Sequence, residues 1–423
     1  MVRELKHTEI GDIPVDWEVQ TFEETFKILS NNTLSRENLN NRGGEVRNIH
    51  YGDILTQFSE LLKCSEEEIP YINDLSLLSS STQLLQEGDL IIADTAEDEA
   101  VGKATEIQGL GEGKLVSGLH TIPCRVKKGD FVPGWLGYYM NSDMYHDQLI
   151  PYITGIKVSS ISKSAIAETL ILIPPKEEQA KIVEVLNDID TEIFQKNRLL
   201  SKKKLVKNGL IQMLVSGNSR LKGYTQKWVT RKIGAMTKVS SGGTPSTSNE
   251  DYWNGDIPWM NSGELNLKIV NNVEGRITEM GLANSSTHWI PAYSVLIGLA
   301  GQGKTRGTAA YNTFELCTNQ SIAAIYPNDK IFDSKYLYYL MDTKYEQLRE
   351  LSSGGGGRGG LTKKLIEEFE VFIPHDLEEQ KMIAAILTDM DEEIRLISEN
   401  IAKMCNIKKG TINDLISGKI RLV

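Results

Sequence analysis

The sequence predicts an α+β fold built by internal duplication. We expect two mixed α/β globular halves and two long helices, one after each half, pairing as an antiparallel coiled coil about a pseudo-two-fold axis. Three observations predict this fold: a long-range repeat, apolar residues at coiled-coil spacing after each half, and strand-like runs inside the halves. With 423 residues, of which 40% are hydrophobic, the chain is long enough to bury more than one core.

Charge and cysteine content exclude several classes of protein. The 46 basic and 57 acidic side chains give a net charge of -11, so any contact with nucleic acid must be local. The four cysteines are far apart and form no C-x-x-C pair, and no H-E-x-x-H occurs, which argues against a disulfide framework and a metal site. No window resembles a signal peptide or a membrane span, and we expect a cytoplasmic protein that contacts no membrane.

The repeat relates the two halves of the chain. Residues 177–193 reappear as residues 378–394 at an offset of 201. The offset changes to 200 upstream and to 211 near the start of each half. The aligned residues include Tyr138-Tyr139 with Tyr338-Tyr339, Ile173-Pro174 with Ile373-Pro374, Trp17 with Trp228, and Gly52-Asp53-Ile54 with Gly263-Glu264-Leu265. Offsets that change by small insertions are typical of a duplicated unit.

Each half is followed by apolar residues at alternating steps of four and three, the spacing of a coiled-coil seam. The predicted seam consists of Ile182, Leu186, Ile189, Ile193 and Leu200 in the first copy and Ile383, Leu387, Met390, Ile394, Ile397 and Ile401 in the second. A helix of roughly 35 residues is about 50 Å long. One such segment alone could be an ordinary core helix. Two equivalent copies favour an antiparallel pair that holds two similar domains at a fixed separation.

These patterns predict four segments: a globular domain at 1–175, a spacer helix at 176–221, a second globular domain at 222–374 and a C-terminal spacer helix at 375–423. Strand-like runs such as residues 88–94 and 294–300 lie within the globular domains. Between 194 and 232 the chain has basic but no acidic residues. That stretch is either a solvated face or a surface for phosphate or an acidic partner.

Several loops of the globular domains combine glycine with polar and cationic side chains, at 154–162, 240–249, 300–307 and 352–360. Glycine allows close backbone approach to a ligand, and the polar groups suit phosphate or base edges. The alternative for each loop is a simple flexible turn.

The segment Gly298–Thr305 matches the Walker A formula of nucleotide-binding loops. A phosphate loop needs a helix that begins at its Lys-Thr. The residues that follow have no helical period, so nucleotide binding is kept only as an alternative. We find no catalytic constellation and no S-adenosylmethionine loop, and therefore predict a chain that is not an enzyme and carries no catalytic, cofactor or metal residues.

The order of two differing globular domains and two similar helices resembles the DNA-specificity subunit of type I restriction-modification systems. The second half contains the phrases SGGTPSTSNEDYWNGDIPWMNSGEL, AGQGKTRGTAA and CTNQSIAAIYP, and both halves approach the helix through a YY pair and an IP-rich EEQ segment. The first half departs from this phrasing, with VRNIHYGDI and SGLHTIPCRV at the corresponding places. That difference predicts a different DNA half-site.

The resemblance implies that each globular domain is a target-recognition domain for one half of a bipartite, asymmetric duplex DNA target. It also implies host-defence partners: two modification subunits that methylate adenine with S-adenosylmethionine, and two restriction subunits that use ATP and Mg²⁺. The outer helix faces are assigned to the modification subunits. The remaining alternative is a coiled-coil scaffold without DNA specificity.

Candidate DNA contacts follow from the resemblance and from side-chain chemistry. Cationic and hydroxyl groups suit phosphate or guanine, and amides suit adenine unless they are buried structural groups. We expect Trp259 to belong to the core rather than to a stacking surface. The candidates are Lys157, Asn261, Lys304, Thr305, Arg306, Gln320 and Arg358.

Overall fold

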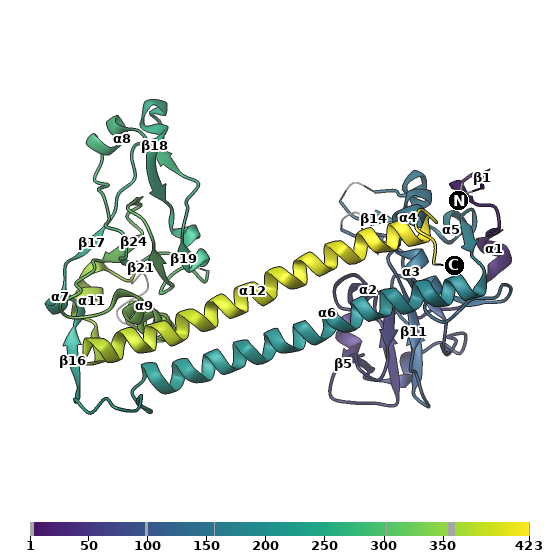
Figure 1. The fold of residues 1–423 in the computed structure, drawn as a ribbon, viewed down its shortest axis with the longest axis horizontal. Helices are drawn as coiled ribbons and strands as arrows, with labels where there is room; N and C mark the ends of the chain where they lie inside the picture. Colours follow the sequence, from purple (N-terminus) through teal and green to yellow (C-terminus); the bar gives the residue numbers. More distant parts are fainter. Residues whose placement is uncertain (1–3, 98–99, 156, 302, 354–359, 423) are drawn as a thin grey trace. The chain divides into compact units, whose positions relative to one another are not determined.

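The computed structural model describes residues 4–97, 100–155, 157–301, 303–353 and 360–422 (Figure 1). The chain divides into two compact units. Unit 1 contains residues 1–197 and 400–423, and unit 2 contains residues 198–399. Each unit therefore holds one globular half together with a stretch of both long helices.

The long helices are α6 (Lys176–Leu210) and α12 (Leu377–Ile416), and α6 continues into a π-helical turn, η4 (Ile211–Val215). Both helices begin soon after a proline and carry two glutamates in the first turn. Acidic side chains there face the partial positive charge of a helix N-terminus.

Within each unit, a stretch of α6 runs antiparallel to a stretch of α12 (Figure 1). The ion pairs that join the two helices, or a helix and the segment after the other helix, show this direction. As the residue number rises along α6, the number of its partner on α12 falls. The pairs are Glu178–Arg421 and Asp190–Lys408 in unit 1, and Lys203–Glu393, Lys207–Asp391 and Arg220–Glu379 in unit 2.

The predicted seam residues fall into two groups by burial. Those nearest each helix start are fully buried and belong to the cores of the globular halves: Ile182 and Leu186 in unit 1, Ile383 and Leu387 in unit 2. The others, Ile189, Ile193, Leu200, Met390, Ile394, Ile397 and Ile401, are half-buried. Along the middle of each helix the half-buried residues thus form a narrow stripe.

The central sheets of the two units have the same strand order, and all neighbours are antiparallel except the last pair. Unit 1 has β4 (Phe26–Ile28), β13 (Thr121–Val126), β9 (Leu90–Ala93), β11 (Ala104–Gln108) and β7 (Leu61–Lys63). Unit 2 has β17 (Val239–Ser241), β24 (Ile322–Ile325), β21 (Val295–Gly298), β22 (Ala309–Asn312) and β19 (Ile269–Val270). The duplication predicted from the sequence is confirmed.

A second sheet in each unit contains one equivalent parallel pair. Unit 1 has β12 (Lys114–Ser117), β6 (Val46–Ile49), β8 (Tyr71–Ile72) and β5 (Leu39–Asn40), and unit 2 has β20 (Arg276–Ile277), β18 (Trp253–Met260) and β23 (Cys317–Thr318). Two-stranded ladders lead to the long helices: β3 (Glu18–Thr21) with β15 (Leu170–Ile173), and β16 (Trp228–Lys232) with β25 (Glu370–Pro374).

Short helices complete each half. They are α1 (Phe22–Thr25), α2 (Tyr51–Thr56), α3 (Trp135–Met140), α4 (Asp143–Leu149) and α5 (Lys163–Ala167) in unit 1, and α7 (Ile233–Met236), α8 (Glu279–Ala283), α9 (Ser334–Thr343), α10 (Tyr345–Ser353) and α11 (Lys363–Glu368) in unit 2. Unit 1 also has two short ladders, β1 (Leu5–Thr8) with β2 (Gly11–Pro14) and β10 (Thr95–Ala96) with β14 (Ser159–Ser160).

The contacts correct one detail of the sequence alignment. The Tyr138 hydroxyl donates to Asp190 at 2.7 Å, and the Tyr339 hydroxyl donates to Asp391 at 2.7 Å. Tyr138 therefore corresponds to Tyr339 and not to Tyr338, so the offset in this helix is 201. The doubled tyrosines allowed either alignment, and the contact with the long helix decides it.

All four cysteines are free thiols, with Cys405 exposed and the others buried. In the described part of the chain, no helix combines the length and the apolarity needed to cross a bilayer.

Candidate nucleic-acid interface

Two polar loops of unit 2, at 240–249 and 300–307, meet at one edge of its central sheet, whereas the loop at 352–360 lies largely outside the described residues. Strand β21 ends at Gly298 opposite Ile322, the first residue of β24. Strands β18 and β23 run in parallel and end at the same edge, at Met260 and Thr318. We call this surface the loop edge of unit 2, and it consists of the described residues within 242–246, 261–262, 299–306 and 319–321.

The loop edge brings together most of the residues singled out in the sequence. Lys304, Gln320 and Asn261 are exposed, whereas Thr305 and Arg306 are half-buried. They come from three loops that the sequence separates by up to 59 positions. Their contact with DNA stays a prediction.

Close backbone packing explains the paired glycines after β17. A Cβ on Gly242 would lie 2.0 Å from the carbonyl oxygen of Thr318, and a Cβ on Gly243 would lie 2.5 Å from the amide nitrogen of Thr287. The indole N–H of Trp259 donates to the Gly243 carbonyl at 3.0 Å, and Trp259 is buried, as expected of a core residue. The glycine loop is therefore a fixed part of the edge.

The two amide candidates have different surroundings. The Thr244 hydroxyl donates to the Gln320 side-chain oxygen at 2.5 Å, which holds Gln320 at the surface. Asn261 accepts from the Gly263 N–H at 2.8 Å and donates to Glu264 at 2.9 Å. Both amide atoms of Asn261 thus cap the short helix that follows, so Asn261 has a structural role although it is exposed and not buried.

The nucleotide-binding alternative fails on the geometry of the loop after β21. The loop leads from β21 directly into β22, and the two strands are antiparallel neighbours. Lys304 and Thr305 therefore precede a strand, whereas in a phosphate loop a helix begins at the Lys-Thr pair.

Helix α10 supports this loop from one side. The Tyr345 hydroxyl donates to the Lys304 carbonyl at 3.2 Å, and the Arg349 guanidinium donates to the Gly303 carbonyl at 2.8 Å. Arg306 donates to the Ser352 hydroxyl at 3.1 Å. The loop is held so that Lys304 stays at the surface while Arg306 packs against α10.

Unit 1 has an equivalent loop edge, which backbone hydrogen bonds identify residue by residue. The Asp94 N–H donates to the His120 carbonyl in unit 1. The Leu299 N–H donates to the Ser321 carbonyl in unit 2. We define the loop edge of unit 1 by its aligned positions: His50, Tyr51, Asp94, Thr95 and His120 correspond to Asn261, Ser262, Leu299, Ala300 and Ser321.

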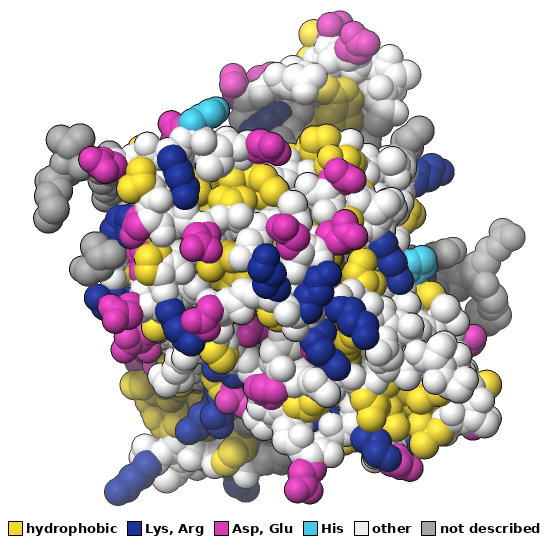
Figure 2. Space-filling model, turned by 90° about the vertical axis from the view of Figure 1, so that its right-hand side faces the viewer, with side chains coloured by type: hydrophobic (Ala, Val, Ile, Leu, Met, Phe, Trp, Pro, Cys, Tyr) yellow, Lys and Arg dark blue, Asp and Glu magenta, His cyan; other side chains and the backbone are white. Residues whose placement is uncertain are grey.

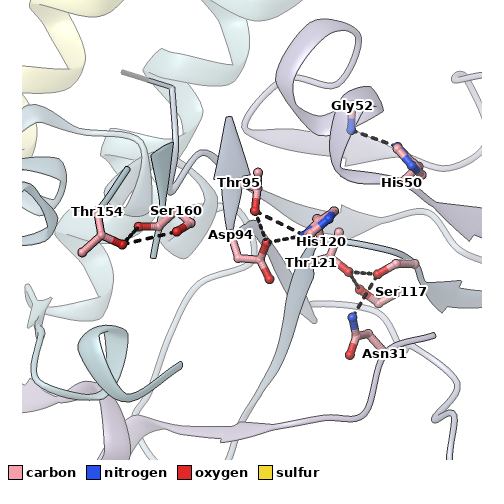
Figure 3. Close-up of polar contacts among 11 residues, drawn as sticks. Asn31, His50, Gly52, Asp94, Thr95, Ser117, His120, Thr121, Thr154 and Ser160 are labelled. Atoms are coloured by element: carbon pink, nitrogen blue, oxygen red, sulfur yellow. Dashed lines mark hydrogen bonds and ion pairs between the residues drawn. The ribbon is translucent and has the colours of Figure 1, made fainter. Parts of the chain in front are cut away.

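These unit 1 residues were not among the candidates from the sequence. His120 is half-exposed, and its Nδ1 lies 3.2 Å from the Thr95 hydroxyl and 3.3 Å from the Asp94 carboxylate (Figure 3). The aligned Gly52 and Gly263 already relate the segments around His50 and Asn261. Extending that alignment two residues back could have identified His50, but the His120 cluster needs the tertiary contacts.

His50 lies beside the same cluster. Its Nδ1 accepts from the Gly52 N–H at 3.2 Å (Figure 3), and its ring centroid lies 4.6 Å from that of Tyr51. Burial, and next the charge of Arg36, lower the pKa of His50. The imidazole is therefore neutral at pH 7, and its proton is on Nε2 because Nδ1 is an acceptor.

The two remaining candidate cations, Lys157 and Arg358, have different outcomes. Lys157 is exposed in the loop between Thr154 and Ser160, which are joined by backbone hydrogen bonds and by the Thr154 hydroxyl (Figure 3). Strand β14, at the end of this loop, pairs with β10, so Lys157 belongs to a segment beside Asp94 and Thr95. Arg358 lies outside the described residues.

The surface charge is mixed. Figure 2 shows lysine and arginine side chains interspersed with aspartate and glutamate on one face. In the described ranges, no three histidine, cysteine, aspartate or glutamate side chains are placed to hold a metal ion. Local loop chemistry, not bulk charge, must carry any DNA contact.

Comparison with known families decides the assignment. The family model described as the type I restriction modification DNA specificity domain matches residues 14–203 and 225–404. The chain belongs to this DNA specificity family. The two matches correspond to the two duplicated halves, so each half of this family member is one specificity domain.

Relatives extend over nearly the whole chain of this family member. It is 24% identical over 433 aligned positions to a Methanocaldococcus jannaschii chain named as the MjaX specificity subunit of a type I restriction enzyme, covering 99% of this chain and 96% of the relative. The EcoR124I/EcoR124II specificity subunit of Escherichia coli is 27% identical over 235 residues, covering 55% of this chain and 56% of the relative.

A solved structure shares the fold of this specificity-family chain. The S subunit of a type I restriction-modification system from M. genitalium superposes with a TM-score of 0.58 at 14% identity, covering 98% of this chain and 99% of that one. The likeness supports the fold of two mixed α/β domains with long helices.

Proposed function

We propose that this chain is the specificity subunit of a type I restriction-modification complex, and that it recognises a bipartite, asymmetric sequence in duplex DNA. One observation carries the proposal: two equivalent loop edges, on equivalent scaffolds, carry different side chains. At five aligned positions the groups are two imidazoles, a phenol, a carboxylate and a hydroxyl in unit 1, against an amide, two hydroxyls and two apolar groups in unit 2. Different groups at equivalent places suit two different half-sites.

The long helices support a role in assembly. Besides the half-buried stripe, they expose apolar side chains such as Leu205, Val206, Leu396 and Ile407. Leu205 and Val206 are adjacent in the sequence, and contiguous exposed apolar surface is typical of protein contacts. We propose that these faces bind two modification subunits, and that two restriction subunits complete the complex.

The chemistry then belongs to the partners. Methylation with S-adenosylmethionine and ATP-driven cleavage with Mg²⁺ would occur on the modification and restriction subunits, and this chain would be non-catalytic. Acting on the chromosome would place the chain in the cytoplasm.

Methylation sequencing of the host genome tests this proposal. We expect a split adenine-methylated motif that disappears when the gene for this chain is deleted and returns on complementation. An unchanged methylome in the deletion strain would contradict the proposal and favour a coiled-coil scaffold without DNA specificity.

A further inference from the structure

The loop edge of unit 1 contains a cluster of aromatic rings that has no counterpart in unit 2. The ring centroids of His50 and Tyr51 lie 4.6 Å apart, and those of Tyr51 and His120 lie 5.3 Å apart with the planes nearly perpendicular. At the aligned positions unit 2 has Asn261, Ser262 and Ser321. We call His50, Tyr51, His120, Asp94 and Thr95 the imidazole cluster.

The scaffold beneath the cluster does not explain the difference. Ile49 and Met260, which precede His50 and Asn261, are both fully buried, as are Ile54 and Leu265. The N-cap geometry is shared, since both His50 and Asn261 accept from the N–H two residues later. The backbone around His50 and Asn261 is therefore equivalent, and the groups at the surface differ there. At the third aligned position the backbone differs as well, because φ is positive at His120 and not at Ser321.

His120 is held in a costly conformation. Its φ is 55°, in the left-handed region that side chains rarely adopt outside asparagine, aspartate and histidine. A non-glycine residue in this region is strained. The His120 side chain remains 45% exposed although it contacts Asp94 and Thr95. The strained backbone therefore holds an imidazole at the surface, and the imidazole does not fill a core.

Hydrogen-bond roles around His120 are determined by Asp94 and Thr95. An ionised carboxylate only accepts, so the Thr95 hydroxyl donates its single proton to Asp94 at 2.8 Å. Toward His120 the Thr95 oxygen can then only accept, and Nδ1 of His120 must carry a proton. In the neutral imidazole Nε2 is consequently an acceptor, on the side of the ring away from Asp94 and Thr95 (Figure 3).

The neighbouring loop adds acceptors. Asp94 and the exposed Glu97 lie on the loop after β9, where the equivalent loop of unit 2 carries Lys304 and Arg306. Cytosine presents an amino donor in the major groove without an adjacent acceptor, whereas adenine and guanine present the acceptor N7. The Nε2 acceptor of His120 therefore suits the amino group of cytosine best.

We propose that the imidazole cluster is the base-contacting element of unit 1 and that His120 determines a cytosine in its half-site, with Nε2 accepting from the cytosine amino group. His50 and Tyr51 position the ring of His120. The inference rests on the proposed function and specifies one of its contacts.

The test uses the full chain, together with any modification subunits that copurify from its host, and selection from a random duplex library at pH 8, where an ordinary imidazole is neutral. The variants are His120→Gly, which relieves the backbone strain, and His120→Asn, which tolerates a positive φ. His7→Ala is the matched control, because His7 is an exposed imidazole of unit 1 that also contacts an aspartate, Asp12, away from the loop edge.

We expect wild type and His7→Ala to select the same split motif. Both His120 variants should lose selection at one cytosine of one half-site, with the other half-site unchanged and the melting temperature preserved. Replacing that C·G pair by G·C should weaken wild-type binding about tenfold and leave the His120 variants unaffected.

The contrary outcomes are distinct. If both variants select the full wild-type motif with wild-type affinity, or if the His120-dependent base is not cytosine, the inference is wrong and the proposed function stands. If the wild-type chain selects no split motif, the proposed function itself fails.

Discussion

Units 1 and 2 hold their helices by the same tyrosine–lysine contact but in different electrostatic surroundings. In unit 1 the amine of Lys408 lies 5.6 Å from the Tyr138 ring centre, and it pairs with Asp190 and Glu60 in a buried site. In unit 2 the amine of Lys207 lies 5.7 Å from the Tyr339 ring centre.

The position of Glu60 is occupied by a lysine in unit 2. Backbone bonds place Lys268 there, since the N–H of Tyr311 donates to Lys268 as the N–H of Glu106 donates to Glu60. Lys268 pairs with Asp342 at 2.7 Å. The two units thus keep the same tyrosine–lysine–aspartate contact, while the groups around it and on the loop edges differ.

The largest effect we predict separates the two lysines. Lys408→Ala leaves two carboxylates without their cation in a site where Lys408 is 8% exposed, and should destabilise unit 1 by about 3–5 kcal/mol. Burial opposes the charge, yet Glu60 and Asp190 raise the pKa of Lys408 above its ordinary value. Lys207→Ala removes a pair that is more open to solvent, and should cost about 1 kcal/mol or less.

Urea unfolding with tryptophan fluorescence, together with amide hydrogen exchange resolved by unit, measures both lysine variants. If Lys408→Ala and Lys207→Ala lower the unfolding free energy of their units equally, the additional carboxylate of unit 1, Glu60, has no energetic consequence.

A second prediction concerns Glu106, whose place in unit 2 is taken by Tyr311. The carboxyl of Glu106 accepts from the Gly134 N–H at 2.5 Å and from the Gly137 N–H at 2.9 Å, in a nearly fully buried site at the start of α3. Glu106→Gln places amide hydrogens against one of these donors and should destabilise unit 1 by about 1–3 kcal/mol.

The pH dependence of this effect has a definite sign. Burial raises the pKa of Glu106 from 4.5 to about 7, so between these values the folded chain binds a proton that the unfolded chain has released. The contribution of Glu106 to the unfolding free energy is therefore fully present below pH 4.5, falls as pH rises to 7, and is constant above pH 7. The wild-type advantage over Glu106→Gln in unfolding free energy should shrink across this window, and a pH-independent difference would contradict the assignment.

The smallest effect concerns the two equivalent loops of the loop edges. Lys304→Ala should weaken DNA binding by a few-fold for all sequences and reduce the slope of log affinity against log salt by about 1. Glu97→Ala in unit 1 should instead strengthen binding slightly, because an acidic side chain repels phosphate. A salt titration of duplex binding measures both, and an unchanged slope for Lys304→Ala would remove Lys304 from the phosphate contacts.

Much of the architecture could be predicted without coordinates. The four-three spacing from Ile182 and from Ile383 determined the long helices, because a helix buries one stripe wherever it packs. The repeated EEQ segments determined the duplication. The missing helical period after Thr305 was sufficient to disfavour a phosphate loop. Each of these patterns is present in the sequence itself and does not depend on contacts between distant residues.

Other features depended on the tertiary structure. Asn261 has the chemistry of an adenine contact, yet both its amide atoms cap a helix turn. His120 and Asp94 are ordinary residues in sequence, and they become a cluster only because two antiparallel strands end at the same edge. Tyr138 and Tyr139 are adjacent, and only the long helix selects which one meets Asp190. Local spacing determines the elements, but hydrogen-bond partners drawn from distant loops are determined by how those elements pack.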